Sequence, residues 1–306
     1  MSDNGIFEAS LEFPAPNAAR RLAALVGIDD QKARLEKGLR LMLDKGSIER
    51  WSEKHHGKKL PIVGYFQSRP PLFILAGDVG TGKTALAENI GDAVAKAEKL
   101  DVTLHRLSLS ARGTGMVGEM TKLVSAAFSQ VGEYARKAKS TSGKAKSGHI
   151  LMIDEADALA QSRETSQMHH EDRAGVNALI RGINEFAEAE LPVAVIMCTN
   201  RLGAIDPAVR RRAAEILSFG RPGPDQRKMV LSAGLAHTGM TDAEIQRLVE
   251  ATGERNGSPA FTYSDLTQRL IPNIALDAYP DQPIKFTRAL KLATEMVAAP
   301  TFDEGK

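Results

Sequence analysis

The sequence feature that most constrains the fold is a glycine-rich segment, Gly77-Asp78-Val79-Gly80-Thr81-Gly82-Lys83-Thr84. It follows an apolar run of strand length, Leu72 to Ala76, and precedes a helical pattern from Ala85. A strand, a glycine turn and a helix N-terminus in this order wrap phosphate oxygens with backbone N–H groups, and this context disfavours a simple turn that binds no nucleotide. The spacing predicts a phosphate-binding loop in which Lys83 reaches the β- and γ-phosphates and Thr84 binds Mg²⁺.

Three further apolar runs, Val102–Leu109, Ile150–Ile153 and Val193–Cys198, are each followed by a polar or helical stretch. Short buried strands that alternate with helices indicate an α/β fold, with a parallel sheet between helices. Two prolines and two glycines at Gly220–Pro224 end this pattern, and the segments beyond are helical. We therefore expect a flexible N-terminal arm over residues 1–17, an α/β domain over 18–220 and a small all-helical domain over 221–306.

Polar residues at the ends of two predicted strands complete a candidate catalytic site. Asp154 and Glu155 follow the Ile150–Ile153 strand, where Asp154 would hold Mg²⁺ through water and Glu155 would polarise the attacking water. Asn200 ends the next strand and could orient that water, although a lone Asn there is also a common turn former. Arg210-Arg211-Arg212 are either a solvated basic face or arginines supplied to a neighbouring subunit's phosphate.

Composition narrows the function classes. Forty Lys and Arg against 38 Asp and Glu leave a net charge of +2, so we do not expect a protein that coats nucleic acid. The single cysteine, Cys198, excludes an intrachain disulfide and a four-thiolate zinc site, and we expect it to be a small buried apolar residue. No run reaches the ~18 apolar residues of a membrane span, and Met1–Glu8 has no secretory pattern, which predicts a cytoplasmic protein.

This set of motifs, in this order, resembles the AAA+ ATPases over roughly residues 18 to 300. The resemblance implies a P-loop domain with a five-stranded parallel sheet, a helical lid domain, ATP and Mg²⁺ as cofactors, and a ring, commonly a hexamer. It also implies that Val26, Gly27 and Ile28 contact adenine, and that Arg211 and Arg212 face a neighbour's γ-phosphate. The nucleotide-binding residues expected on this basis are Val26, Gly27, Ile28, Asp78, Val79, Gly80, Thr81, Gly82, Lys83, Thr84, Ala85 and Arg269.

The segment Gly115–Val124 is similar to the pore loop of protein-remodelling AAA+ enzymes. The stretch from Ser162 through His169 to Ile180 resembles the pachytene-checkpoint type of AAA+ ATPase, which remodels HORMA-domain proteins and includes bacterial relatives that act in anti-phage defence. Met116 and Val117 match a substrate-gripping pore loop, with Met where an aromatic residue is usual, or they are loop residues turned to the core. His169 and His170 fall in a second pore loop and lack the acid or thiol framework of a metal site. The resemblance implies an ATPase that threads part of a HORMA-domain client through a pore.

The sequence departs from that family at two places. The phosphate loop begins at Gly77, so we expect no separate N-terminal adaptor domain. Asp265-Leu266 stand where a lid arginine would sense the γ-phosphate, and Arg269, one turn later, is the substitute we name. Two other functions remain open on the sequence: a DNA-associated motor or loader with a Lys- and Arg-lined channel, and a scaffold that binds ATP but hardly hydrolyses it.

Overall fold

The structure is a computed structural model that describes residues 5–67, 69–108, 119–139, 145–159, 170–255 and 257–301. The chain divides into two compact units. The sheet unit comprises residues 1–24, 30–76 and 84–218, and the helical unit comprises residues 25–29, 77–83 and 219–306. The phosphate loop and the Leu25–Asp29 turn therefore group with the C-terminal helices, although both precede the sheet's later strands in sequence.

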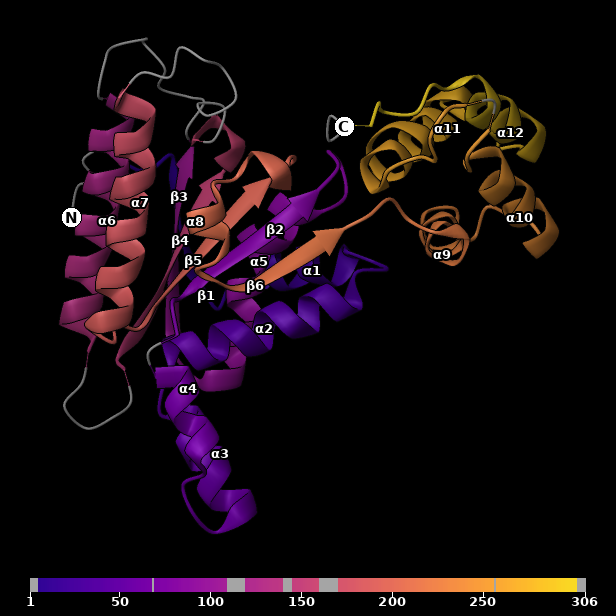
Figure 1. The fold of residues 1–306 in the computed structure, drawn as a ribbon. Coiled ribbons are helices and arrows are strands. Elements are labelled where there is room, and N and C mark those ends of the chain that lie inside the picture. Colours follow the sequence, from indigo (N-terminus) through magenta and orange to yellow (C-terminus); the bar gives the residue numbers. More distant parts are fainter. Residues whose placement is uncertain are drawn as a thin grey trace. The chain divides into compact units, whose positions relative to one another are not determined.

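The strands of the sheet unit are β1 Ala9–Phe13, β2 Leu72–Gly77, β3 Asp101–Ser108, β4 Ser147–Asp154, β5 Val193–Thr199 and β6 Ala213–Phe219. Its helices are α1 Pro16–Ala24, α2 Asp29–Leu43, α3 Ser47–His56, α4 Gly64–Gln67, α5 Lys83–Glu98, α6 Glu119–Ala138, α7 His170–Glu188 and α8 Pro207–Arg210. Short 3-10 turns are η1 Pro61–Val63, η2 Ala156–Leu159 and η3 Leu202–Ala204. The α/β alternation predicted from the sequence is thus confirmed (Figure 1).

Within the described residues the sheet has six strands in the order β1-β3-β4-β5-β2-β6, where the resemblance to AAA+ ATPases predicted five parallel ones. β2, β3, β4 and β5 pair in parallel, as expected, and β6 lies at the edge beside β2. The additional strand is β1, which pairs antiparallel with β3 from Ala9↔Arg106 to Phe13↔Val102. The prediction of a flexible arm over residues 1–17 is therefore wrong for this part of the chain.

The reason for β1 is visible in its residues. Ala9-Ser10-Leu11-Glu12-Phe13 alternates apolar and polar side chains, the period of a strand with one covered face. Phe13 is 4% exposed and lies against α5, where a Cβ added to Gly91 would be 2.5 Å from the Phe13 ring. The run is short and stands beside Pro14 and Pro16, so only the β3 edge makes it a strand.

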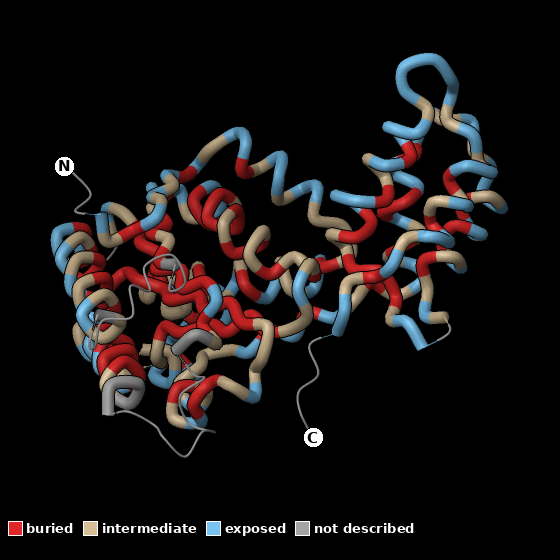
Figure 2. The backbone as a smooth tube through the Cα atoms, turned by 90° about the horizontal axis from the view of Figure 1, so that it is seen from above, coloured by how far each residue is buried: buried red, intermediate tan, exposed pale blue. Residues whose placement is uncertain are grey.

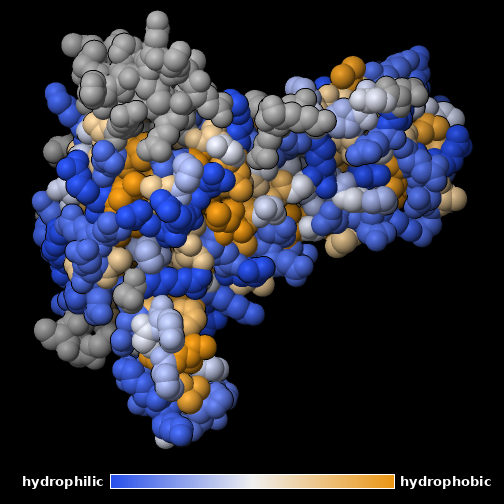
Figure 3. All heavy atoms as spheres, viewed as in Figure 1, coloured by the Kyte–Doolittle hydropathy of each residue, from blue (hydrophilic) through white to orange (hydrophobic). Residues whose placement is uncertain are grey.

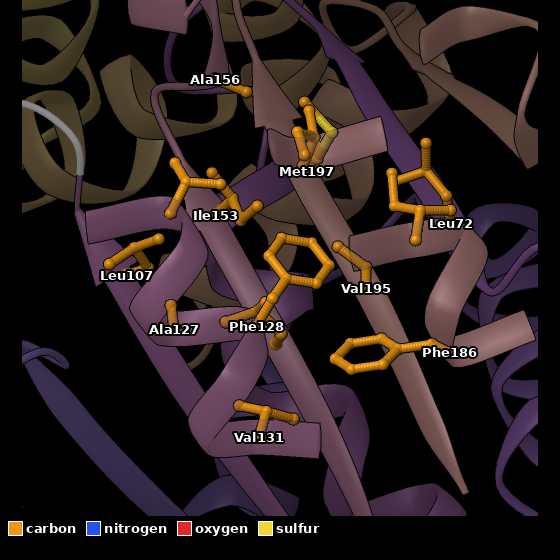
Figure 4. Packing of buried hydrophobic residues seen from close by; sticks show 14 of the residues in the cluster. Leu72, Leu107, Ala127, Phe128, Val131, Ile153, Ala156, Phe186, Val195 and Met197 are labelled. Atoms are coloured by element: carbon orange, nitrogen blue, oxygen red, sulfur yellow. The ribbon is translucent and has the colours of Figure 1, made fainter. Parts of the chain in front are cut away.

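Helices cover both faces of the sheet. α6 and α7 pack side by side over one face, where Phe128 and Phe186 meet strand residues such as Val195 (Figure 4). On the other face, α2 approaches so closely that a Cβ on Gly38 would be 2.4 Å from the Phe73 ring. The central strands are consequently buried along their length (Figure 2), and Cys198, 2% exposed on β5, is buried as predicted.

The helical unit contains α9 Pro224–Gly234, α10 Asp242–Ala251, the π-helix η4 Asp265–Leu270, α11 Ile271–Ala278 and α12 Phe286–Glu295. Its apolar core includes Leu231, Leu248 and Leu266. A capping box opens α10: the Glu244 N–H donates to Thr241 Oγ1 at 3.3 Å, and the Thr241 N–H donates to Glu244 Oε2 at 2.8 Å. An all-helical C-terminal part was predicted, and the described residues from α9 onward contain no strand longer than one bridge.

Some apolar surface remains exposed on the α3–α4 segment. Trp51, Ile62 and Tyr65 are 43%, 50% and 80% exposed. Apolar side chains gather on this projecting part of the sheet unit in Figure 3. Grouped exposed apolar residues are typical of surfaces that contact other proteins. Across the described part of the chain, no helix combines the length and apolar character that a membrane crossing requires.

Candidate functional site

The phosphate loop has the backbone geometry that its glycines predicted. Gly77 has φ +149°, and a Cβ there would be 1.9 Å from the Phe219 carbonyl oxygen. Gly80 has φ +76°, and its Cβ would be 2.8 Å from both Ser264 Cβ and Thr262 Oγ1. Side chains at these two positions would clash with backbone or with the residues that open η4. The loop therefore packs directly on the helical unit, and the Ser264 N–H donates to the Gly80 carbonyl at 3.0 Å.

Lys83 is held inside the loop. Its ammonium donates to the carbonyl oxygens of Gly77 and Asp78, both at 2.7 Å, and the residue is 5% exposed. Thr81 closes the same turn through a bond from its hydroxyl to the Asp78 carbonyl at 2.7 Å. A lysine preorganised in this way can exchange loop carbonyls for phosphate oxygens without a large change of position, as its predicted role requires.

The turn expected to contact adenine is also fixed in the helical unit. Gly27 has φ +80°, and its carbonyl accepts bonds from the Gln226 amide and from the Tyr263 hydroxyl, the latter at 3.2 Å. Ile28 is 5% exposed, and its Cδ1 would lie 3.7 Å from a Cβ on Gly82. Burial, with the Asp29 charge nearby, raises the pKa of Tyr263 to about 12, so this hydroxyl remains a donor. The structure thus places Ile28 beside Gly82 of the phosphate loop.

In the sheet unit, Asp154 lies at the carboxyl end of β4. Its Oδ1 accepts a bond from the Thr84 hydroxyl at 3.3 Å and one from the Glu155 N–H at 3.0 Å. Its Oδ2 accepts a bond from Arg106 Nη2 at 3.2 Å. The two residues predicted as Mg²⁺ ligands, Thr84 and Asp154, are therefore adjacent although 70 positions separate them in sequence.

These two oxygens fit a nucleotide-bound magnesium. Mg²⁺ in such sites takes one or two protein oxygens and completes its shell with phosphates and water. Within the described ranges there is no group of three His, Cys, Asp or Glu side chains that could hold a metal by themselves. The Thr84 hydroxyl and the Asp154 carboxylate supply the hard oxygens that a magnesium–nucleotide complex needs.

Glu155 has an unusual backbone. Its φ is +51°, a left-handed conformation that costs a non-glycine residue about 1–3 kcal/mol. The bond from its N–H to Asp154 Oδ1 holds this conformation, and the side chain is exposed. Strain of this kind is common where a side chain must be presented to a substrate, which agrees with the predicted role of Glu155.

Asn200 lies at the same edge of the sheet. β4 and β5 are parallel and pair up to Ile153↔Met197, so Asp154 and Asn200 follow neighbouring strand ends. The preceding residue, Thr199, is 1% exposed; its hydroxyl donates to Asp157 Oδ1 at 3.3 Å and accepts the Arg201 N–H at 3.0 Å. The turn that carries Asn200 is consequently fixed, and Asn200 itself is partly exposed.

The three consecutive arginines have different environments. Arg212 donates from Nε to Asn184 Oδ1 at 3.2 Å and from Nη1 to the Ala208 carbonyl at 2.9 Å. Arg210 is partly buried, and its Nε finds no acceptor among the residues that the structure describes. Arg211 is exposed. Of the two predicted trans-acting residues, Arg211 is presented to solvent while Arg212 is bonded within its own chain.

The predicted lid substitute, Arg269, is bonded to Asp265. Its Nη1 donates to Asp265 Oδ1 at 2.6 Å, and its side chain is 47% exposed. Burial would raise the pKa of Asp265, but bonds from the Thr262 and Ala299 N–H groups and from Arg269 outweigh burial and lower it. Asp265 is thus an ionised anchor at the start of η4, and Arg269 is its partner there.

Four expected pore residues are not placed. Met116, Val117 and His169 lie outside the described residues. His170 is the first residue of α7, and its side chain likewise lies outside the described part of the chain.

Two arginines in contact with site residues were missed on the sequence. Arg106 donates hydrogen bonds to Glu88 and Asp154. Burial raises the pKa of Glu88, and the positive charge of Arg106 offsets only part of that rise. Arg221 donates from Nε to Asp78 Oδ2 at 2.9 Å. Neither arginine belongs to a motif, and both contacts join residues distant in sequence, so no local signal could have identified them.

Comparison with known proteins identifies the family of the chain. Residues 73–221 match the model of the ATPase family associated with various cellular activities (AAA). The chain is 54% identical over 298 residues to CD-NTase-associated protein 6 of Escherichia coli strain MS 115-1, covering 97% of this chain and 96% of that protein. It resembles a chain of the solved E. coli MS115-1 HORMA:CdnC:Trip13 complex, with a TM-score of 0.89, 52% identity and 97% of each of the two chains covered. It also resembles Rhizobiales Trip13, with a TM-score of 0.76, 45% identity, and 96% of this chain and 99% of that chain covered. The chain therefore belongs to the AAA family of ATPases and is similar over nearly its whole length to the Trip13 proteins.

Proposed function

We propose that this ATPase works as a cytoplasmic hexameric ring that remodels a HORMA-domain protein by threading part of it through a central pore. The proposal rests mainly on the residues at the carboxyl end of β4 in the sheet unit, where hydrogen bonds join Asp154 to Thr84 and to the Glu155 N–H. These residues have the arrangement needed for repeated ATP hydrolysis rather than for nucleotide binding alone, which argues against a non-hydrolysing scaffold.

The residue roles follow from the geometry. Lys83 and the loop N–H groups would bind the phosphates, and Thr84 and Asp154 would hold Mg²⁺, which neutralises charge on the phosphates when it is bound. The exposed Glu155 carboxylate would take the proton of the attacking water, and Asn200 at the neighbouring strand end would orient that water. The hydrogen bond from Arg106 fixes the Asp154 carboxylate in position.

Arg211 supports the ring. An arginine that stabilises the transferring phosphate can accelerate turnover by ~10³–10⁵, and it can come from an adjacent subunit. Arg211 is exposed, as a residue donated to a neighbour must be. Arg212 would orient this segment through its bonds to Asn184 and Ala208.

The partner is proposed from the relatives. The Trip13 chain at 52% identity was solved in a complex with HORMA and CdnC proteins, and the relative at 54% identity is named for its association with a CD-NTase. We infer that this chain acts on a HORMA-domain protein in the same kind of anti-phage system. Met116, Val117, His169 and His170 are the residues proposed to grip the client.

A trapping experiment tests the proposal. Glu155→Gln should bind ATP but not hydrolyse it, so the ring should retain its client. The purified variant with ATP would be mixed with the HORMA protein of the E. coli MS115-1 complex, with the E. coli relative carrying the matching substitution as positive control. Co-elution of a HORMA-bound hexamer on a sizing column with light scattering is expected, and ADP should abolish it. The proposal fails if the E. coli control retains the HORMA protein and this chain, folded and ATP-bound, does not.

A further inference from the structure

Arg221 is the residue that connects the phosphate loop to the C-terminal part of the helical unit. Besides Asp78, its guanidinium donates to the carbonyl oxygens of Ala260 at 2.7 Å, Ala299 at 2.9 Å and Pro300 at 2.9 Å. The side chain is 12% exposed. One arginine thus joins segments that are 39 to 143 residues away from it in sequence.

The contact with Asp78 has an electrostatic consequence. Asp78 is the second residue of the loop that binds the nucleotide phosphates, and its side chain is 21% exposed. A carboxylate beside phosphates repels them, more strongly where water is partly excluded. The Arg221 charge 2.9 Å away offsets this repulsion, because the ion pair presents almost no net charge to the phosphates.

Arg221 itself is held firmly. The Ala299 and Pro300 carbonyls fix one end of its guanidinium, and the Ala299 N–H in turn donates to the buried Asp265 at 3.0 Å. The fork geometry of a guanidinium permits all these bonds at once, which a lysine could not make. The C-terminal segment Ala299–Pro300 is thereby part of the support of the phosphate loop.

We propose that Arg221 is a positioning residue that sets the affinity for nucleotide by neutralising Asp78 within the phosphate loop. Without Arg221, the negative charge of Asp78 would weaken nucleotide binding. The loss would be larger for ATP than for ADP, because ATP carries more negative charge. The proposal concerns ATP binding and does not depend on the identity of the client.

The test changes the charges of Arg221 and Asp78 with polar substitutions and does not truncate either side chain to alanine. Four variants of the full chain, Arg221→Gln, Arg221→Lys, Asp78→Asn and the Arg221→Gln/Asp78→Asn pair, would be titrated with a fluorescent non-hydrolysable ATP analogue and with fluorescent ADP. Arg221→Gln should weaken binding of the ATP analogue about tenfold and that of ADP by a smaller factor. Asp78→Asn should bind the ATP analogue about threefold more tightly than the natural chain, because Arg221 is then uncompensated. The double variant should recover most of the loss.

Two outcomes separate this role from a purely structural one. If Arg221 acted only as a brace, Arg221→Gln and Asp78→Asn would weaken both nucleotides equally, and the double variant would be no better than Arg221→Gln. That result would overturn the proposal. An equal loss of ATP-analogue affinity in Arg221→Gln at low and at high salt would also overturn it, because salt screens electrostatic interactions. If Arg221→Gln does not fold, the other two single variants test the proposal. Asp78→Asn must bind the ATP analogue more tightly than the natural chain, and Arg221→Lys must bind it with an affinity within about threefold of the natural chain.

Discussion

A pair of buried histidines makes the stability of the sheet unit depend on pH in a way that can be calculated. His105 on β3 and His149 on β4 are 4% and 8% exposed, and His105 Nε2 lies 3.3 Å from His149 Nδ1. Tyr134 of α6 stacks on His105 with ring centroids 5.5 Å apart, and Ser10 of β1 lies 3.5 Å from His105 Nδ1. The pair therefore connects the unpredicted strand β1 to the centre of the sheet.

Burial lowers the pKa of both histidines from 6.5 to about 4, and His105 further disfavours a charge on His149. The unfolded chain binds more protons than the folded one between these values, so stability falls as the pH drops through 6.5 towards 4 and is constant well above 6.5. For one histidine the loss at pH 5 relative to pH 7 is about 2 kcal/mol, and for the pair about 4 kcal/mol. That is a large part of the ~5–15 kcal/mol by which a domain is stable.

The measurement is urea denaturation followed by circular dichroism at pH 7 and pH 5. His149→Gln should reduce the pH-dependent loss in the free energy of unfolding by about half, because only His105 then gains a proton on unfolding. Carboxylates elsewhere titrate equally in both proteins and cancel in the comparison. His55→Gln, which replaces an exposed histidine of α3, is the control and should keep the natural dependence. An equal loss in His149→Gln and the natural chain would refute the reasoning.

Two other predictions concern the site and the core. Arg211→Ala and Glu155→Gln should each lower ATP turnover, measured as phosphate release, by about 10³-fold. A mixture of the two proteins should regain activity, because some subunit interfaces then combine an intact Glu155 with an intact Arg211. No recovery in mixed rings would contradict a site shared between subunits. Phe128→Ala should lower the free energy of unfolding by about 3–5 kcal/mol, since Phe128 is 4% exposed and packs on the Phe186 ring at 5.1 Å. The exposed Leu276→Ala is its control and should cost less than about 0.5 kcal/mol. A loss for Phe128→Ala as small as that of the control would show that the α6–α7 contact carries little stability.

The features that could be predicted from the sequence are those formed by residues close together in the chain. The phosphate loop requires glycines, a lysine and a threonine within eight consecutive positions, and the acidic strand end requires only Ile150–Glu155. Strand and helix periodicity indicated the α/β order. Because a parallel sheet brings strand ends to one edge, the pattern of residues predicted Asp154 and Asn200 at the same edge, and their strands are neighbours in the sheet.

Features that depend on contacts between residues distant in sequence could not be predicted, because only the fold brings those residues together. Five alternating residues, Ala9–Phe13, form a strand only because the β3 edge has unpaired backbone groups and a covered face for Phe13. The Arg221–Asp78 bond joins residues 143 positions apart, and Arg106–Asp154 joins residues 48 apart. A long charged side chain has many possible partners in the sequence, and packing alone selects one, because an arginine removed from water must find its acceptors where the fold provides them.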